Sequence, residues 1–264
     1  MQELKGKVIW LTGASSGIGK ALAFQLAKEH AYLILSSRSS EKLKQVQKEC
    51  LQFTDNCLIY PVDITDSESL NATYHSVISK TVGVDILINN AGQSQRSLAE
   101  ETTLAVDRHV MDVNFFSMVD LTKLVLPDMI KRGSGHIVVV SSITGKFGFP
   151  LRTAYAGSKH AVQGYFESLR GELKKHGIYV TIVSPGRVQT DISKKAITGN
   201  GMAYGKMDSG QAEGMPADLC AKKIVRGVKK RRKDFLVGNR ELLMVYIRKF
   251  LPALYHNIVD KIKN

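Results

Sequence analysis

The sequence predicts an α/β fold in which helices cover both faces of a doubly wound parallel sheet. Short apolar runs alternate with helical patterns over most of the 264-residue chain. The runs are nearly continuous in apolar residues, as expected of parallel strands buried on both faces. Neither a linker nor an internal repeat interrupts the chain, so residues 1–264 are expected to form a single domain.

The first predicted strand, Val8–Leu11, runs directly into the glycine-rich segment Thr12–Gly19 and then into a helical pattern. Strand, glycine turn and helix form the context that a nucleotide-binding motif requires. Glycines let backbone N–H groups approach a pyrophosphate at the positive end of a helix. The alternative is a turn whose glycines serve only packing.

The second strand, 32–36, ends where an acidic residue would bind a ribose 2′-hydroxyl. The chain has Ser37, Arg38 and Ser39 there instead. An arginine flanked by hydroxyl groups suits a 2′-phosphate through charge-assisted hydrogen bonds, so the sequence favours NADP over NAD. A solvated arginine at the start of a helix over 41–50 is the alternative.

The third strand, 57–60, is followed by Asp63 and Ile64. Asp63 is expected to accept a hydrogen bond from an adenine amino group. The next residues, Thr65 to Ser67, resemble a helix N-cap, which explains the polarity without a ligand. The helix that begins there is expected to reach Val82.

The fourth strand, 85–88, ends in Asn89-Asn90-Ala91-Gly92. Amides and a glycine at a strand end can lie against a cofactor, and turn formation is the alternative. One long helix is then expected over 101–131. Asn114 in its middle is a poor helix former, so it either faces solvent or has a reason to point inward.

The fifth strand, 136–141, leads to Ser142 and to a helix from about Tyr155 to His176. Tyr155 and Lys159 are four residues apart and share one helix face. The Lys159 ammonium is therefore expected beside the Tyr155 phenol, where its charge would lower a pKa of about 10 towards neutrality. Such a phenol exchanges protons at cellular pH, and Ser142 is placed to hydrogen-bond the oxygen involved.

The sixth strand, 178–183, ends in Pro185-Gly186 and is followed by a long segment, 191–215, rich in Gly, Ser and Lys. Long structured loops in compact domains tend to be functional. Its scattered flexible apolar side chains suit a hydrophobic substrate of variable shape, so the segment is predicted to be a substrate lid. A disordered surface insertion is the alternative.

The C-terminal part carries two basic features. The run 229–233 falls at the end of a helix that begins near Pro216, where cations complement the helix dipole; nucleic-acid binding is the less favoured interpretation. Residues 240–264 form an amphipathic helical tail interrupted by Pro252. A peripheral membrane helix and a helix packed on a partner subunit explain this tail equally well.

The overall composition indicates the class of partner and the cellular compartment. The formal net charge of +13 favours an anionic partner, such as nucleic acid, a lipid surface or a phosphorylated cofactor. The three cysteines match no metal or redox spacing, so they are interpreted as structural and no metal site is expected. Their small, odd number indicates a reducing compartment. No apolar run approaches the ~20 residues that span a bilayer.

Taken in order, these motifs resemble the short-chain dehydrogenase/reductase family from about Lys5 to Val237. The resemblance implies a Rossmann-type sheet with a seventh strand near 235–237. It implies Tyr155 as acid/base, Lys159 as its pKa modulator and a ribose ligand, Ser142 as the carbonyl-orienting residue, and Asn114 as the anchor of a water-linked proton relay. The residues assigned to the cofactor are Gly13, Ser15, Ser16, Gly17, Ile18, Gly19, Ser37, Arg38, Ser39, Asp63, Ile64, Asn90, Ala91, Gly92, Tyr155, Lys159, Pro185, Gly186, Val188 and Thr190, the last reaching the nicotinamide carboxamide.

One residue departs from the family pattern: Ser117 stands where a glycine is often found three residues after the helix asparagine. The segments 37–39 and 92–97 resemble the branch that includes membrane-associated retinoid, steroid and carbonyl reductases of the endoplasmic reticulum. Members of that branch usually carry an N-terminal anchor. The present chain begins almost at its first strand, so a cytoplasmic protein is expected, with peripheral membrane contact through the C-terminal tail as an option.

The resemblance implies an NADP(H)-dependent oxidoreductase that transfers a hydride between nicotinamide and a hydrophobic alcohol, ketone or aldehyde. It also implies a homodimer or homotetramer built on the helices of Asn114 and Tyr155. The alternatives are a non-catalytic nucleotide-sensing or interaction protein and, less favoured, a nucleic-acid binder. The presence of both Tyr155 and Lys159 argues against a non-catalytic role.

Overall fold

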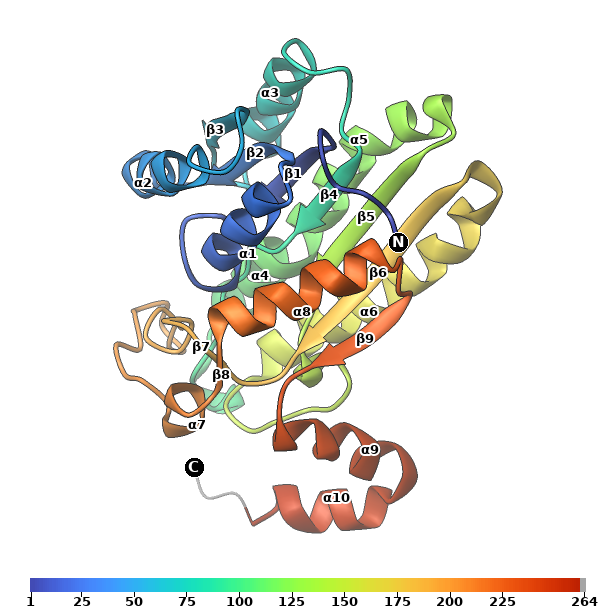
Figure 1. Ribbon diagram of the computed structural model, residues 1–264. Coiled ribbons are helices and arrows are strands. Elements are labelled where there is room, and N and C mark those ends of the chain that lie inside the picture. Colours follow the sequence, from blue (N-terminus) through green and yellow to red (C-terminus); the bar gives the residue numbers. More distant parts are fainter. Residues whose placement is uncertain (262–264) are drawn as a thin grey trace.

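The computed structural model describes residues 1–261 and contains a seven-stranded sheet covered by helices on both faces (Figure 1). All six strand pairs are parallel, which confirms the predicted doubly wound, Rossmann-type architecture. The strands are β1 (Val8–Thr12), β2 (Tyr32–Ser37), β3 (Cys57–Pro61), β4 (Ile86–Asn89), β5 (Gly135–Val140), β6 (Ile178–Pro185) and β9 (Asp234–Val237). Their spatial order is β3-β2-β1-β4-β5-β6-β9. The order reverses between β1 and β4, and ligands bind at the carboxyl ends of strands beside such a switch point.

Each face of the sheet has its own hydrophobic core. In β1, Ile9 and Leu11 point into the core beneath α1 (Gly17–Lys28), α2 (Ser40–Cys50) and α8 (Ala217–Lys229). Val8 and Trp10 point into the core beneath α3 (Ser67–Ile78), α5 (Ser117–Arg132) and α6 (Thr153–Leu173). Figure 1 shows α1 and α8 side by side over one face. Because alternate strand residues enter opposite cores, both faces had to be apolar, as the continuous runs predicted.

Side-chain caps set several helix starts. The Ser39 hydroxyl accepts a hydrogen bond from the Lys42 N–H at the start of α2. Asp66 caps α3 by accepting from the N–H groups of Glu68 and Ser69, as the sequence suggested. However, α3 ends at Ile78 and does not reach Val82.

The single helix predicted over 101–131 is wrong. The structure breaks it into α4 (Leu104–Met111), the π-helical turn η2 (Asp112–Phe116) and α5, preceded by the short turn η1 (Ala99–Glu101). Thr103 caps α4 by accepting from the Val106 N–H. The π turn adds one residue to the helical turn and places Asn114 on the buried side, as π bulges often do at functional sites.

The remaining helices and strands are short. They are η3 (Ile143–Gly145), η4 (Lys174–His176), α7 (Ser209–Ala212) and the two-residue strands β7 (Val188–Gln189) and β8 (Met215–Pro216), which pair with each other. The β7–β8 pair joins the two ends of the segment 191–215. The two ends of that segment therefore lie next to each other.

The C-terminal tail is two helices rather than one. After η5 (Arg240–Leu242) come α9 (Leu243–Phe250) and α10 (Pro252–Val259), with Pro252 at the first position of α10, where its missing N–H has no cost. Buried Tyr255 packs edge-on against Phe147. Residues 262–264 of the predicted tail lie outside the described residues. Across 1–261, none of the helices combines the length and the apolar character needed to cross a bilayer.

Several residues of the basic run make contacts within the chain. Lys229 forms an ion pair with Glu29, and the Arg231 guanidinium lies 4.0 Å from the centre of the Tyr179 ring. The run follows the end of α8, as the helix-dipole interpretation expects. The three cysteines, Cys50, Cys57 and Cys220, are buried in the core as free thiols.

Candidate active site

A cavity of about 810 Å³ opens at the carboxyl ends of the strands. Every residue that the sequence assigned to cofactor binding lies on its wall, from Gly13 to Thr190, and so does Ser142. Asn114 is fully buried behind the wall. The motifs that follow separate strands in the sequence therefore share one cavity, because parallel strands end at the same edge of a sheet.

The glycine turn is fixed against the fourth strand. Gly13 and Gly17 have positive φ angles of 65° and 54°, which side chains with a Cβ rarely adopt. A Cβ on Gly19 would overlap the carbonyl oxygen of Gly13, and one on Gly13 would lie 2.8 Å from Cα of Ala91. The backbone here is thus packed too closely to accept side chains.

Asn90 joins this turn to the end of β4. Its side-chain amide donates to the carbonyl oxygens of Thr12 and Gly13, at 3.1 and 3.4 Å. The Thr12 hydroxyl in turn accepts from the backbone N–H groups of Asn90 and Ala91. Asn90 therefore holds two strand ends together, a structural role that adds to its place on the cavity wall.

The end of β2 places polar side chains on the cavity wall. The Ser37 hydroxyl is buried and has no hydrogen-bond partner within residues 1–261, although buried polar groups normally have one. Arg38 and Ser39 flank it on the cavity wall. Together with the close-packed glycine turn, these residues fit a nicotinamide dinucleotide, and the preference for a 2′-phosphate stays a prediction.

Asp63 lies near this end of the cavity, with its carboxylate already occupied. It accepts hydrogen bonds from the N–H and hydroxyl groups of Thr65, at 3.0 and 2.8 Å. Burial opposes its charged form, but these bonds, with the charges of Arg38 and His109, lower the pKa of Asp63 overall. The expected contact with adenine would use a lone pair of the Asp63 carboxylate that Thr65 does not occupy, on a group that stays ionised.

Ser142, Tyr155 and Lys159 converge at the other end of the cavity. The Lys159 ammonium donates to the carbonyl oxygen of Val140 at 3.0 Å and lies 5.8 Å from the centre of the Tyr155 ring. The neighbouring Ser141 hydroxyl donates to the Lys159 carbonyl oxygen. The Ser142 hydroxyl accepts from the N–H and hydroxyl groups of Thr144, at 3.2 and 2.9 Å. Both serines line the cavity, and the choice of Ser142 as the acting serine stays a prediction.

The predicted direction of the Tyr155 pKa is wrong. Burial raises the pKa of the Tyr155 phenol above 10, and this outweighs the lowering by a hydrogen bond with Ser142 and by the charges of Arg96 and Arg152. Burial also lowers the pKa of Lys159 to about 8. Desolvation disfavours the charged forms of both groups, and a sequence does not show that both lie in the interior.

Asn114 organises the wall from behind. Its side chain accepts from the Gln93 N–H at 2.8 Å and donates to the Gln93 carbonyl oxygen and to the Ser158 hydroxyl, each at 2.9 Å. Ser158 donates in turn to the Tyr155 carbonyl oxygen. Asn114 therefore ties η2 to the segment after β4 and to the catalytic turn of α6, while its role in a proton relay stays a prediction. Ser117 fits without disturbance, since its hydroxyl donates to the Val113 carbonyl oxygen at 2.8 Å.

The structure adds three charged residues that the sequence analysis did not select. Arg96, from the segment after β4, donates to one carboxylate oxygen of Asp208 at 2.5 and 3.0 Å. Arg152, just before α6, donates to the same oxygen at 3.0 Å. All three line the cavity beside Tyr155, and they are called the arginine–aspartate triad below. Both arginines lower the pKa of Asp208 despite its burial.

The arginine–aspartate triad and several hydrogen bonds hold the segment 191–215 over the cavity. Backbone N–H groups of Ile197 and Arg96 donate to the carbonyl oxygens of Ser94 and Ile197, at 2.9 and 2.8 Å. Lys195 donates to the hydroxyl of Ser16 in the glycine turn at 3.1 Å. The segment thus contacts both ends of the cavity, where a lid would lie, and its opening and closing stay a prediction.

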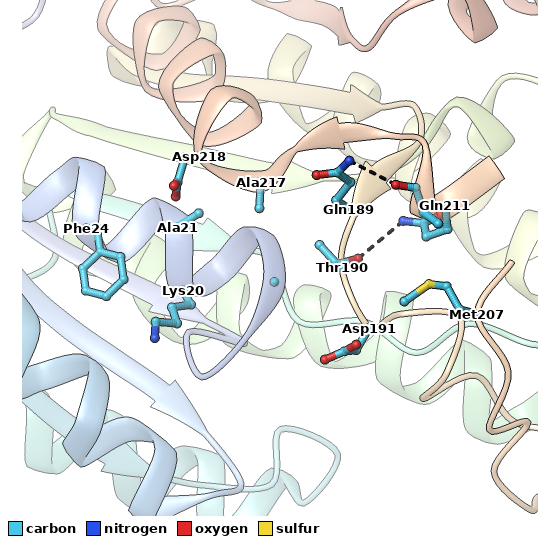
Figure 2. Close-up of a pocket in the computed structure, with 12 residues that line it drawn as sticks. Lys20, Ala21, Phe24, Gln189, Thr190, Asp191, Met207, Gln211, Ala217 and Asp218 are labelled. Atoms are coloured by element: carbon cyan, nitrogen blue, oxygen red, sulfur yellow. Dashed lines mark hydrogen bonds between the residues drawn. The ribbon is translucent and has the colours of Figure 1, made fainter. Parts of the chain in front are cut away.

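A second cavity, of about 600 Å³, lies between α1 and this segment. Figure 2 shows Lys20 and Phe24 on one side and Gln189, Thr190 and Gln211 on the other. It shares Thr190, Gly17 and Gln211 with the main cavity. It is therefore an outer continuation of the same site.

Comparisons with known proteins agree with this geometry. A profile described as short chain dehydrogenase matches residues 7–201. The dehydrogenase/reductase SDR family member 7B of Xenopus laevis is 41% identical over 264 residues, covering 97% of this chain and 82% of the relative. The SDR family protein 7-like of Drosophila melanogaster is 40% identical, covering 98% of this chain and 81% of the relative.

Solved structures show the same fold. A short-chain dehydrogenase from Streptomyces avermitilis superposes with a TM-score of 0.81 at 27% identity, over 97% of each chain. A short chain dehydrogenase/reductase from Burkholderia phymatum, solved in complex with NAD, gives a TM-score of 0.86 at 23% identity, over 96% of each chain. At that identity the second structure supports the fold alone.

Proposed function

Because the chain belongs to the short-chain dehydrogenase family of oxidoreductases, we propose that it is an NADP(H)-dependent enzyme that interconverts a hydrophobic alcohol with its ketone or aldehyde. The observation that carries the proposal is the single cavity that joins the close-packed glycine turn to Ser142, Tyr155 and Lys159. A nicotinamide cofactor and a small substrate would meet there. Fold alone would not support this step, so the site carries it.

The preference for NADP(H) rests on the end of β2. Arg38 offers a permanent positive charge, and the unpaired Ser37 hydroxyl offers a further hydrogen bond to a 2′-phosphate. An enzyme that prefers NAD would need an acidic residue here to accept from the 2′-hydroxyl. The Burkholderia phymatum protein was solved with NAD, so the fold alone does not select NADP.

When bound, the reduced cofactor supplies the hydride. Tyr155 supplies the proton to the oxygen of the carbonyl group, and its raised pKa keeps the phenol protonated at neutral pH. Ser142 donates a hydrogen bond to the same oxygen as negative charge develops there. A protonated phenol at rest suits carbonyl reduction, whereas alcohol oxidation needs the phenolate and should accelerate as the pH rises.

The walls beyond Tyr155 support a hydrophobic substrate. Phe147 and Phe149 come from the loop before α6, Ile192 from the segment 191–215 and Met244 from α9, and all four line the cavity. Apolar walls with a few directed polar groups are typical of small-molecule sites. Met244 and the aromatic rings can adapt to substrates of different shape.

We further propose a homodimer or homotetramer. Members of this family generally form oligomers. Leu104 on α4 and Phe116 in η2 are exposed, and both belong to the segment around Asn114 on which the resemblance places the subunit contact. Exposed apolar groups of this kind are typical of interfaces.

The direct test is to measure oxidation of NADPH and NADH with a panel of hydrophobic aldehydes, ketones, quinones, steroids and retinoids. The proposal predicts turnover with at least one apolar carbonyl compound and a clear preference for NADPH. Turnover confined to NADH would contradict the cofactor assignment. Tight NADPH binding without turnover of any compound would favour a nucleotide-sensing protein.

A further inference from the structure

The two C-terminal helices expose an unusual number of large apolar side chains. On α9, Leu243, Tyr246 and Phe250 follow at intervals of three and four residues and so share one helix face. Leu251 and Leu254 continue the exposed surface into α10, and Phe250 is 66% exposed. These five residues are called the α9–α10 face below. Within residues 1–261 they form a dense group, whereas most other exposed apolar residues are isolated.

The opposite side of the same helices is firmly packed. Tyr255 is buried against Phe147, and its hydroxyl donates to the carbonyl oxygen of Gly148. Val245 and Ile247 pack on the same small core. Figure 1 shows α9 and α10 projecting as a hairpin beyond the end of the sheet. The helices are thus held in a fixed orientation that points their apolar face away from the domain.

The charge around this face is positive. Between residues 240 and 261 there are four Lys or Arg residues and two acids: Arg240, Arg248, Lys249 and Lys261 against Glu241 and Asp260. The Glu241 carboxylate accepts from the backbone N–H groups of Arg187 and Asn239. Lys249 is exposed and its ammonium lies 5.2 Å from the centre of the Phe250 ring, whereas the Arg248 guanidinium lies 5.4 Å from the centre of the ring of Tyr255 on the packed side. A basic rim beside an apolar face attracts a negatively charged surface.

We propose that α9 and α10 dock the protein on an anionic lipid bilayer, with the α9–α10 face inserted at the level of the headgroups. Amphipathic helices with bulky apolar residues on one face and cations beside them bind membranes in this way. Anionic headgroups complement Lys249, which lies beside Phe250 on this face. A second copy of the chain fits less well, because a two-fold contact through this face would bring the cations of both copies together.

The same helices reach the proposed active site. Met244 of α9 lines the main cavity, and Phe147 both lines that cavity and contacts Tyr255. Docking would therefore place the substrate end of the cavity close to the bilayer. This consequence rests on the proposed function: a hydrophobic carbonyl substrate would enter from the lipid phase. The docking itself does not depend on catalysis.

The test is co-sedimentation of the full chain with vesicles of phosphatidylcholine alone and of phosphatidylcholine with phosphatidylserine. Binding is expected to the anionic vesicles, to fall with rising salt, and to weaken at least tenfold in the double variant Phe250→Glu/Leu254→Glu. Leu219→Glu on α8 is the matched control, since Leu219 is 44% exposed and Leu254 45%. This control should bind as the wild type does.

Thermal unfolding and light scattering accompany each variant, because a misfolded chain would also fail to bind. Equal sedimentation of wild type and the double variant would overturn the proposal, as would equal binding to neutral and anionic vesicles. A wild-type dimer that the double variant converts to monomers, without vesicle binding by either, would assign the face to a second copy. NADPH oxidation measured without lipid tests the proposed function separately.

Discussion

The two ends of the main cavity are built in different ways. At the cofactor end, backbone groups and short polar side chains join neighbouring strand ends, as when Asn90 donates to the carbonyl oxygen of Thr12. At the substrate end, charged side chains join segments far apart in the sequence: Arg96 and Asp208 are separated by 112 positions. Thr12 and Asn90 are 78 positions apart, but each belongs to a short motif at the end of its strand, and such motifs can be recognised in the sequence. The substrate end depends on long-range contacts that can change while the fold remains.

Tyr155 lies where the two ends meet, so its removal should have the largest effect. Tyr155→Phe removes the proton donor and keeps the ring, and turnover is expected to fall by about 10²- to 10⁴-fold. NADPH affinity should change little, because the glycine turn and Arg38 are untouched. Steady-state kinetics and fluorescence titration measure the two quantities, and near-normal turnover would show that the phenol is not the acid/base.

Substitution of a glycine in the turn should disrupt cofactor binding. Gly19→Val places a side chain where a Cβ already overlaps the Gly13 carbonyl oxygen, so the turn must shift away from Asn90. NADPH binding is expected to weaken by more than about tenfold, which corresponds to 1.4 kcal/mol. Gly164→Ala on α6 is the control, because no atom lies within 4 Å of its new Cβ. If both variants bind NADPH equally well, the close packing at Gly19 has no part in cofactor binding.

Arg38 should affect the choice of cofactor and little else. Charge-assisted hydrogen bonds contribute about 1.5–3 kcal/mol each, so Arg38→Ala is expected to weaken NADPH binding by about ten- to a hundredfold. NADH binding serves as the internal control and should stay within a few-fold of wild type. A parallel loss for both cofactors would place Arg38 outside the 2′-phosphate site.

The substrate end should respond more weakly and in a different way. Asp208→Asn leaves the Arg96 and Arg152 guanidinium groups without their carboxylate, at a cost of about 1–3 kcal/mol in the free energy of unfolding. The uncompensated positive charge should also lower the pKa of Tyr155, so that alcohol oxidation begins at a lower pH. NADPH affinity should be unchanged. An identical pH profile in wild type and variant would contradict the electrostatic link.

The lowered pKa of Asp208 also predicts that the stability of the protein depends on pH. The pKa of this residue is lowered in the folded protein, so its contribution is present above the unfolded value near 3.9 and is lost as the pH falls through the lower folded value. Acid unfolding of the wild type should therefore show a step that Asp208→Asn lacks. Urea unfolding at several pH values from about 2 to 6, the range in which carboxylates protonate, would measure the free energy of this step.

Much of the fold followed from the sequence because strands buried on both faces leave continuous apolar runs. The break of the predicted 101–131 helix did not, because Asn114 holds the π turn through bonds to Gln93 and Ser158 in other parts of the chain. No local pattern encodes such bonds. The boundary at Pro252 was visible locally, since proline marks the start of α10.

The candidate site divides in the same way. Apart from Tyr155 and Lys159 in α6, the residues predicted for the cofactor lie close after a strand in the sequence, which is why their meeting in one cavity could be predicted. The arginine–aspartate triad was not, since nothing near Asp208 shows that it meets Arg96 and Arg152. The direction of the Tyr155 pKa was also missed, because burial depends on how distant segments cover the phenol. Helix spacing showed only that Lys159 shares a face with Tyr155.

The central claim is that hydride leaves a nicotinamide and reaches a carbonyl carbon beside Tyr155. The most direct measurement uses NADPH with deuterium at both C4 positions and a carbonyl compound that supports turnover, followed by mass spectrometry of the alcohol formed. The account predicts one deuterium on the former carbonyl carbon with the wild type, and almost no labelled alcohol with Tyr155→Phe. Consumption of NADPH without deuterium in the product, or equal labelling by the variant, would contradict it.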